Sequence, residues 1–557
     1  MRATFAIFIG RFSKPKNPKR RSFRKILAGA KGNMKTWVRL LALLLVLLSF
    51  ATLIVACKKE EDPNEGGNNS TAEDGIPESL NYMGETVRIL GWNAEFDEYE
   101  VDLANIGTDN VAGAIYERNL NIQDRLSVVF DIKIQQGNVT YMENFIQHVV
   151  NTYNAAPDEH YDIISGYTKT IGMLATRGYL VDMMTIEDDS NAAYLNPDNV
   201  DRHMGYIDLD RVYWPATMTE TCNFSGSMYF VSGDCSTNTL YMMYAVYFNK
   251  ELIDRQFNKA AQDADLETGT DLLYSYVYDG KWTIDKLIEM TTGFGADTNN
   301  NNKQDNKDRI GLATGTLHAE ALYFGANLRL VDHDTEKILK VSDDYGSLKT
   351  TKLVGKLGKW LTTKDVYIDA YNKWYNDASL SYENAFYNRQ TMFLLMRAYV
   401  GQKIIDNAPG LKFGVLPVPK YDEKQVNYYT DIGNPLSLYG ISANFQVRNN
   451  DKKSTLQMLS AVIECWGSEG YALTTPQIFN VNMLSKWAEG EDEVAMFQYV
   501  RTSIIYDLGK IFGSDLSVMQ QKPLIAATFG NSWSQTYQAY IGTIEAQLAE
   551  LVRGFGF

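Results

Sequence analysis

An alternation of strand-like and helix-like segments near the start of the folded region constrains the fold most. Three short stretches carry strand patterns, namely ETVRILGW, FDIKI and YDIISGYT. Helical spacing of apolar residues marks the segments that follow them, GAIYERNLNIQDRLSV, MENFIQHVVNTYN and IGMLATRGYLVDM. The order β-α-β-α-β-α favours an open, mostly parallel α/β sheet, in which ligands bind at the carboxyl ends of the strands.

The rest of the chain indicates a second unit of the same class. LYMMYAVYFNKELIDRQF reads as a strand that feeds a helix, and KWTIDKLIEMTTGF reads as a helix that Thr283 can cap. RIGLAT, LKFGVLPVPKYDE and SLYGIS read as strands. Helices are expected over much of 346–402, over 453–470 and over most of 485–551.

Charge and motifs exclude several function classes. Residues 1–56 contain twelve Lys/Arg and no Asp or Glu, so the remaining chain has 41 basic against 68 acidic residues, a formal charge of −27. Such an acidic surface repels phosphate backbones, and we expect no nucleic-acid partner. The sequence has no G-x-S-x-G, P-loop or H-E-x-x-H motif, and we expect no enzymatic activity.

The segment from Met34 reads MKTWVRLLALLLVLLSFATLIVAC, with basic residues before an apolar run and a Cys at its end. This pattern is typical of a secretory signal. Its end resembles a lipobox, which implies cleavage after Ala56 and lipidation of Cys57. The alternative is a plain transmembrane anchor, although the apolar run is short for a full span.

Residues 1–33 look unlike a signal peptide, so Met34 is a candidate for the true start. We expect residues 1–56 to be a signal peptide with an upstream extension. Residues 57–83 are polar and rich in Gly and Asn, and we expect them to form a disordered tether.

Two cysteines flank the stretch NFSGSMYFVSGD, which reads as a hairpin with a turn at Ser225–Gly226. Outside the cell Cys222 and Cys235 could form a disulfide. The alternative is that both are small buried residues, as we expect for Cys465.

The polar stretch DTNNNNKQDNKD, residues 297–308, has the ligand spacing of an EF-hand-type calcium loop. Positions 6, 8 and 12 depart from the usual pattern, and a strand follows in place of a helix. We therefore expect a solitary structural calcium site rather than a switch; the alternative is an Asn-rich turn without metal. The expected ligands, of which Lys303 supplies only its carbonyl, are Asp297, Asn299, Asn301, Lys303, Asp305 and Asp308.

YAVYFNKELID followed by GKWTIDKLIEMT resembles the family-1 extracellular solute-binding proteins of bacterial ABC importers. NAFYNRQTMFLLMRAYVGQKI, LKFGVLPVPKYDE and the region from WGSEGYALTTPQ resemble further segments of that family. The resemblance implies a two-lobed, periplasmic-binding-protein-like α/β fold of type II, with open mixed sheets and a ligand cleft between the lobes. Lobe one would comprise residues 84–243 and 420–485, and lobe two residues 244–419 and 486–557. The chain would cross between lobes in Tyr241–Asn249 and near Gly414–Pro419.

The ligand candidates combine residues at predicted strand ends with residues placed by the resemblance. Aromatic rings pack on the apolar faces of sugars, while hydroxyl groups need polar partners. The strand ends and their surroundings supply Trp92, Asn93, Glu95, Tyr167, Thr168 and Trp214. The resemblance places His318, Arg397, Tyr399, Gly433 and Asn434.

The resemblance implies a lipid-anchored protein on the extracellular face of the cytoplasmic membrane. It would capture a solute, an oligosaccharide by expectation, and deliver it to ABC permease subunits, acting as a monomer. Two alternatives stay open: a cell-surface glycan-docking or adhesion lipoprotein, and a glycoside hydrolase.

Overall fold

The computed structural model describes residues 74–93, 110–187, 203–369, 381–478, 491–517, 519, 522–528 and 530–556. All of them belong to one compact unit, Gly67–Phe557. The predicted signal peptide, Cys57 and Glu95 lie outside the described residues. Among the helices described, none has both the length and the hydropathy that a bilayer crossing needs.

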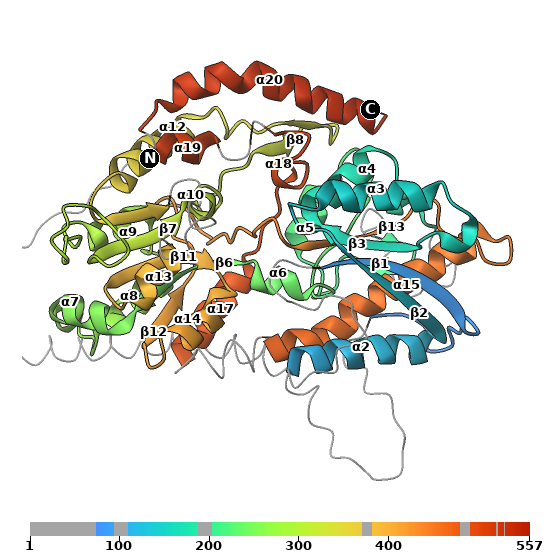
Figure 1. Ribbon diagram of the computed structural model, residues 1–557, viewed down its shortest axis with the longest axis horizontal. Coiled ribbons are helices and arrows are strands. Elements are labelled where there is room, and N and C mark those ends of the chain that lie inside the picture. Colours follow the sequence, from blue (N-terminus) through green and yellow to red (C-terminus); the bar gives the residue numbers. More distant parts are fainter. Residues whose placement is uncertain are drawn as a thin grey trace, which may run out of the picture. The chain divides into compact units, whose positions relative to one another are not determined.

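The first sheet has four strands in the order β13-β3-β1-β2 (Figure 1). Strands β1 to β3 run parallel, and β13 pairs antiparallel with β3. These segments alternate with helices along the chain as the sequence pattern predicts. The elements are β1 (Glu85–Asn93), α2 (Asn110–Leu126), β2 (Val128–Gln136), α3 (Met142–Tyr153), β3 (Ile163–Tyr167), α4 (Thr168–Thr176), β13 (Ser437–Ile441) and α15 (Lys452–Glu469).

The second sheet has five strands in the order β10-β7-β11-β6-β12. β10, β7 and β11 are parallel, whereas β6 pairs antiparallel with both β11 and β12. The predicted cap is confirmed, because the Thr283 side chain accepts a hydrogen bond from the N–H of Lys286 at the start of α9. The strands and the helices near them are β6 (Tyr244–Asn249), α7 (Lys250–Asp263), α8 (Gly269–Tyr278), α9 (Ile284–Thr291), β7 (Ile310–Gly315), α12 (Leu348–Leu361), β10 (Val366–Asp369), α13 (Tyr382–Tyr387), β11 (Thr391–Arg397), α14 (Val400–Asn407) and β12 (Phe413–Leu416).

The predicted α/β class with two open mixed sheets flanked by helices is confirmed. The prediction of helices over much of 346–402 is wrong at β11, which is the central strand of the second sheet. Its sequence TMFLLMR is a continuous apolar run because the strand is buried on both faces. Such a run cannot be distinguished from a buried helix by periodicity.

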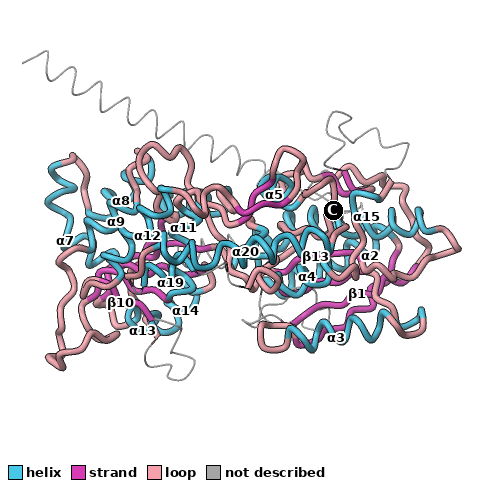
Figure 2. The backbone as a smooth tube through the Cα atoms, turned by 90° about the horizontal axis from the view of Figure 1, so that it is seen from above, coloured by secondary structure: helices cyan, strands magenta, loops and turns pink. Residues whose placement is uncertain are grey.

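The remaining elements are short segments between the sheets' strands and a helical C-terminal region (Figure 2). They are β4 (His203–Met204), β5 (Ile207–Asp208), α5 (Ala216–Cys222), α6 (Thr237–Tyr241), α10 (Thr316–Ala319), α11 (Ala321–Gly325), β8 (Val331–His333), β9 (Leu339–Val341), α17 (Glu491–Thr502), α18 (Leu508–Ile511), α19 (Lys522–Thr528) and α20 (Trp533–Gly554). Helix α20 packs on α12, α19 and β9.

Two residues of the predicted tether pack against the folded chain. Asp74 and Ile76 are buried, and the Asp74 carboxylate forms an ion pair with Arg125 of α2. Ser468 of α15 also donates a hydrogen bond to Asp74. The tether predicted for 57–83 is therefore wrong at Asp74 and Ile76, because a polar sequence can pack where its charge meets a fixed partner.

Three segments cross between the two sheets. Met243 pairs with Ile432, and Thr430 pairs with Ile504, so residues near 243, 430–436 and 503–507 lie side by side. The crossing predicted near Gly414–Pro419 is misplaced. The chain after β12 still contacts residues that pack around the second sheet, because the N–H of Lys420 donates to the carbonyl of Trp282, directly before α9.

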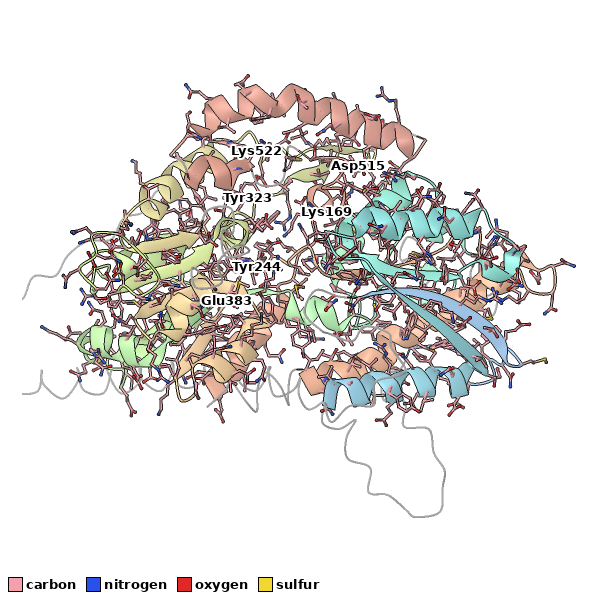
Figure 3. All side chains as sticks on the ribbon, in the orientation of Figure 1. Lys169, Tyr244, Tyr323, Glu383, Asp515 and Lys522 are labelled. Carbon is pink, nitrogen blue, oxygen red and sulfur yellow. The ribbon has the colours of Figure 1, made fainter. Side chains whose placement is uncertain are left out.

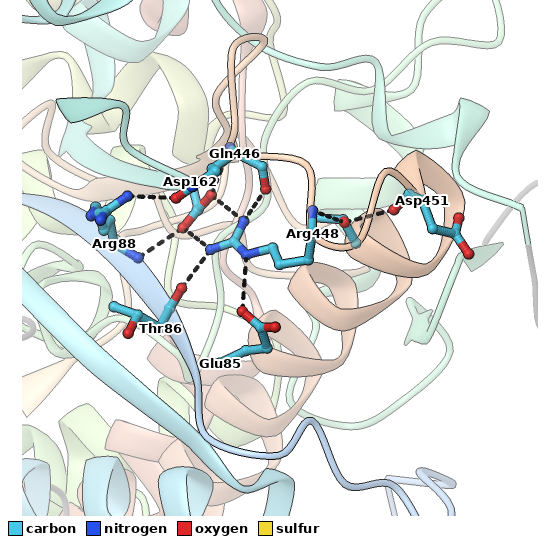
Figure 4. Close-up of polar contacts among 8 residues, drawn as sticks. Glu85, Thr86, Arg88, Asp162, Gln446, Arg448 and Asp451 are labelled. Atoms are coloured by element: carbon cyan, nitrogen blue, oxygen red, sulfur yellow. Dashed lines mark hydrogen bonds and ion pairs between the residues drawn. The ribbon is translucent and has the colours of Figure 1, made fainter. Parts of the chain in front are cut away.

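One buried ion pair fastens the first sheet to the segment before α15 (Figure 4). Both terminal nitrogens of Arg448 lie 2.6 Å from the carboxylate of Asp162, whose side chain is fully buried. Asp162 also accepts the backbone N–H groups of Arg88 and Gln446. The bidentate geometry and the two additional donors satisfy the buried carboxylate.

Candidate functional site

The carboxyl ends of strands from both sheets meet the crossing segments in one region. β3 of the first sheet ends at Tyr167, directly before α4, while β7 and β11 of the second sheet end at Gly315 and Arg397. Thr168, which follows β3, and Arg397 both contact the crossing segment 430–436, at Leu436 and at Gly433. The region therefore has the position that ligand sites occupy in open α/β sheets.

An ion cluster lies at the centre of this region. The Lys510 ammonium is 2.5 Å from a carboxylate oxygen of Asp431 and 3.1 Å from one of Glu320. All three side chains are buried. Burial raises the pKa of Asp431 to about 7, against the opposing effect of Lys510. Burial alone would lower the pKa of Lys510, but the two carboxylates raise it above its ordinary value.

A chain of hydrogen bonds in the second sheet lies beside this cluster, since Lys510 Nζ is 6.0 Å from the centroid of the Tyr244 ring. Arg397 Nε donates to the Tyr244 hydroxyl at 3.2 Å, which lies 3.0 Å from Nδ1 of His318. Nε2 of His318 is 2.5 Å from the Tyr382 hydroxyl. Burial and the neighbouring cations Arg397 and Lys510 hold the pKa of His318 well below its ordinary value.

Lys169 follows Thr168 in the first turn of α4 (Figure 3). Burial lowers the pKa of Lys169, although the nearby carboxylate of Glu320 opposes this effect and Lys510 reinforces it. Within the part of the chain that the structure describes, the Lys169 ammonium has no hydrogen-bond or ion-pair partner.

A small cavity lies beside the cluster. Its lining includes Thr168, Asp431, Asn434 and Lys510. Thr168 donates from Oγ1 to the carbonyl of Leu436, which fixes the start of α4 to a crossing segment. The oxygen Oδ2 of Asp431 is buried and accepts no hydrogen bond from any residue that the structure describes. The cavity can therefore supply polar contacts to a small group that enters it.

The structure brings several predicted ligand residues together. Thr168 and Asn434 line the same cavity. Arg397 touches Gly433, and it connects through Tyr244 to His318. The region thus unites five of the predicted residues, which come from both sheets and a crossing segment.

Other predicted residues have different surroundings. The rings of Trp92 and Tyr167 lie 5.7 Å apart and are buried, and the Trp92 indole donates to Ser437 Oγ at 2.7 Å. Asn93 is exposed at the end of β1. Tyr399 is buried, and its hydroxyl lies 3.3 Å from Glu383. A ligand role for these four residues stays a prediction.

Trp214 belongs to the core that packs between the first sheet's helices and the segment before α5. It is buried, its indole donates to Glu464 of α15, and its ring packs on Tyr213. Its expected ligand role has no support from this position. Nothing in the motif VYWPAT indicates that the indole N–H would donate a hydrogen bond to a buried carboxylate.

Sequence reasoning missed the charged residues of the cluster. Lys510 lies in the apolar stretch LGKIF, and a single lysine in such a stretch is a signal for a buried charge. Lys169 adjoins Thr168, and Asp431 is in the segment DIGNPLS that supplied Gly433 and Asn434. For Glu320, no pattern in the sequence points to this place.

The polar loop 297–308 adopts part of the geometry that a calcium loop needs. Side-chain oxygens of Asp297, Asn299 and Asn301 each accept a backbone N–H within the loop. Asn302, at position 6, has a φ of 58°, the left-handed conformation expected there. The backbone of the loop therefore fits the predicted spacing.

The carboxylates of the loop are arranged differently. Asp305 accepts hydrogen bonds from the side-chain amides of Asn299 and Asn301. Burial on its own would raise the pKa of Asp305, but the hydrogen bonds from the Lys307 N–H and from the Asn301 and Asn299 amides together lower it. Across the described residues, no three side chains of His, Cys, Asp or Glu gather so as to hold a metal ion. Gln304 instead ties the loop to β10 through the carbonyls of Lys364 and Val366.

The predicted turn at Ser225–Gly226 is confirmed, because Phe224 and Ser227 exchange backbone hydrogen bonds. The disulfide is not formed: Cys222 and Cys235 are free and buried, as is Cys465. Burial raises the pKa of the Cys222 thiol. The alternative of small buried residues therefore describes this pair.

Comparison with known proteins finds no matching family model and no matching curated protein. Solved structures do match. A cyclo/maltodextrin-binding protein complexed with maltotetraose shares 12% identity at a TM-score of 0.47, covering 85% of this chain and 97% of that one. The galacto-N-biose/lacto-N-biose I-binding protein of the ABC transporter from Bifidobacterium longum shares 12% at a TM-score of 0.48, covering 86% and 98%.

A third match is the cyclic α-maltosyl-1,6-maltose binding protein from Arthrobacter globiformis, with 11% identity and a TM-score of 0.49, covering 84% of this chain and 99% of that one. The chain is thus similar to sugar-binding proteins over about 85% of its length.

Proposed function

We propose that this protein is an extracellular solute-binding protein that captures an oligosaccharide between its two sheets and delivers it to an ABC permease. The observation that supports this most is that one crossing segment contacts residues at strand ends of both sheets. Thr168, directly after β3, donates to the carbonyl of Leu436, and Arg397, at the end of β11, lies against Gly433. Crossing segments act as a hinge when two such units close on a ligand.

A panel of oligosaccharides, screened against the purified full-length chain by thermal shift and then by calorimetry, tests this function. We expect binding at one site and a decrease of the radius of gyration in small-angle scattering at saturation. Binding without compaction would favour a docking or adhesion lipoprotein, and release of new reducing ends would favour a glycoside hydrolase. Absence of binding to every saccharide would contradict the proposal.

The anchor is a separate part of the proposal. We infer that Cys57 is lipidated, since the apolar run before it ends in LIVAC. Changing Cys57 to Ser should release the protein into the medium or leave it uncleaved. A mature N-terminus elsewhere, together with unchanged membrane fractionation, would contradict lipidation.

We also propose that the loop 297–308 binds a structural calcium ion. The oxygen donors at the required positions and the left-handed Asn302 support the ion. Binding would require Asp297 and Asp308 to approach Asp305, with the amides of Asn299 and Asn301 turned so that their oxygens face inward. The ion would hold the start of β7, whose other end leads to His318.

A further inference from the structure

Helix α20 is buried towards its two ends rather than along its whole length. It has 22 residues, which corresponds to about 33 Å. Its buried side chains are Trp533 at the start and Ile544, Leu548 and Leu551 in the second half. Residues 534–543 between them are half-buried or exposed. A helix that covers one core buries a stripe that repeats along its length, so this pattern indicates a helix with two separate attachments.

The first attachment is on the side of the second sheet. The Trp533 indole donates a hydrogen bond to the carbonyl of Tyr345 at 3.0 Å, and the two rings lie 5.1 Å apart. Both residues are buried. Tyr537, one turn later, fills the space beside the bare Cα of Gly346. These partners directly precede α12, which packs on β10 of the second sheet.

The second attachment is on the side of the first sheet. Phe555, directly after α20, lies 4.9 Å from the ring of Phe224, 5.0 Å from that of Tyr229 and 5.6 Å from that of Phe512. The segment with Phe224 and Tyr229 pairs with β13 two residues later. Phe512 directly follows α18, which packs on α4. Phe555 is only half-buried, so this attachment is the more exposed of the two.

The β8–β9 hairpin contacts the same place as Phe555. The N–H of Ser225 donates to the carbonyl of Lys337, between β8 and β9, at 2.9 Å. β9 also packs on α20. The turn 224–227 therefore receives the hairpin at Ser225 and the end of α20 at Phe224. These contacts give a purpose to a turn that the sequence predicts but that the candidate site does not use.

We propose that α20 and the β8–β9 hairpin form a strap that holds the two sheets in the arrangement described here, and that Phe555 is its releasable end. Crossing segments alone let two such units open as a hinge. With the strap attached, opening requires release of the turn 224–227. The half-buried Phe555 end releases before the buried Trp533 end, because local opening begins where the least surface is buried. The strap goes beyond the proposed function, since it acts whatever the solute is.

Hydrogen exchange and small-angle scattering of the ligand-free, full-length chain test the strap. Exchange of the Ser225 amide reports on the attachment, because this N–H is bonded to the hairpin. Phe555→Ala should speed that exchange at least tenfold and increase the radius of gyration, while amides of β3 and β11 keep their wild-type rates. Phe555→Tyr retains the ring and should behave like the wild type. Arg553→Ala removes an exposed side chain from the last turn of α20 and is the matched control.

A variant on the receiving side tests the same contact if Phe555→Ala does not fold. Tyr229→Ala should act in the same direction, and the double variant should exchange less than twofold faster than Phe555→Ala, because both changes remove one contact.

Three results would overturn the strap. The first is an unchanged radius of gyration in both single variants, even if the Ser225 amide exchanges faster, because only the turn would then have loosened. The second is loss of protection throughout both sheets, which would make Phe555 a part of the common core. The third is an additive effect of Tyr229→Ala and Phe555→Ala. Since no saccharide is used, each of these results leaves the proposed function standing, and absence of saccharide binding leaves the strap standing.

Discussion

Arg397 lies against the bare Cα of Gly433. A Cβ added to Gly433 would be 2.3 Å from Nε of Arg397 and 2.8 Å from its Cζ. The crossing segment therefore has glycine where the guanidinium of the second sheet passes. Since the clash would involve a flexible side chain rather than backbone, the fold can accommodate the extra methyl group by moving Arg397.

Gly433→Ala should for this reason weaken ligand binding more than it weakens the fold. We expect at least a tenfold loss of affinity, equivalent to roughly 1.4 kcal/mol, with a melting temperature close to that of the wild type. Gly355→Ala, where an added Cβ on α12 meets nothing within 4 Å, is the matched control. Normal binding by Gly433→Ala would mean that the position of Arg397 does not matter for the ligand.

Calcium at millimolar concentration should raise the melting temperature of the wild-type chain, because a ligand that binds only the folded state stabilises it. With an affinity at the tighter end of extracellular calcium modules, about 10⁻⁴ M, the gain at 1 mM is about 1.4 kcal/mol. Asp297→Ala combined with Asp308→Ala should abolish the response. Magnesium at equal concentration serves as the control ion, since it prefers stricter octahedral geometry. Identical melting with calcium and with a chelator would leave the loop as a turn.

Asp162→Asn should destabilise the protein strongly without affecting ligand specificity. The substitution removes the negative partner of Arg448, whose side chain is mostly buried. Removing one partner of a buried ion pair lowers the free energy of unfolding by about 3–5 kcal/mol. The comparison variant is Glu187→Gln, which breaks the exposed pair with Lys453 and should cost less than about 1 kcal/mol. Chemical denaturation measures both. Equal effects would show that burial does not decide the strength of these pairs.

The sequence was sufficient for the elements whose pattern is regular. The alternation in 85–176 gave the parallel strands β1 to β3 and their helices, since each strand or helix there has its own periodicity. The apolar run TMFLLMR was ambiguous, because a strand buried on both faces has no alternation to read. The sequence did not indicate that Asp74, in the predicted tether, would pack, because its partners Arg125 and Ser468 are distant in sequence.

The site was predictable only in part, and for a similar reason. Residues at strand ends, such as Thr168, could be chosen from topology, and Arg397 and Gly433 came from the family resemblance. The ion cluster joins Glu320, Asp431 and Lys510, which are separated by about 80 residues or more and have meaning only once the crossing segments lie together. No local pattern encodes such a meeting.

His318 should make stability depend on pH in a way that one variant can isolate. Arg397 can only donate, so the Tyr244 oxygen accepts its N–H and the Tyr244 O–H donates to Nδ1 of His318. Nε2–H then donates to the Tyr382 hydroxyl, which leaves His318 neutral. A second ring proton would leave the Tyr244 O–H without an acceptor, beside Arg397 and Lys510.

The sign of the effect follows from the direction of the pKa shift. The folded state lowers the pKa of His318, so below pH 6.5 the unfolded chain binds a proton that the folded chain refuses. The stability due to this residue is complete above pH 6.5 and falls as the pH decreases, by up to about 1.4 kcal/mol per pH unit. His318→Gln offers an acceptor and a donor but does not titrate. Urea unfolding at pH 7.5 and 5.5 should therefore show a smaller loss for His318→Gln than for the wild type, while the effects of the other ionisable groups cancel in the comparison. Equal losses in the two proteins would mean that His318 is protonated in the folded state or that its surroundings are open to water.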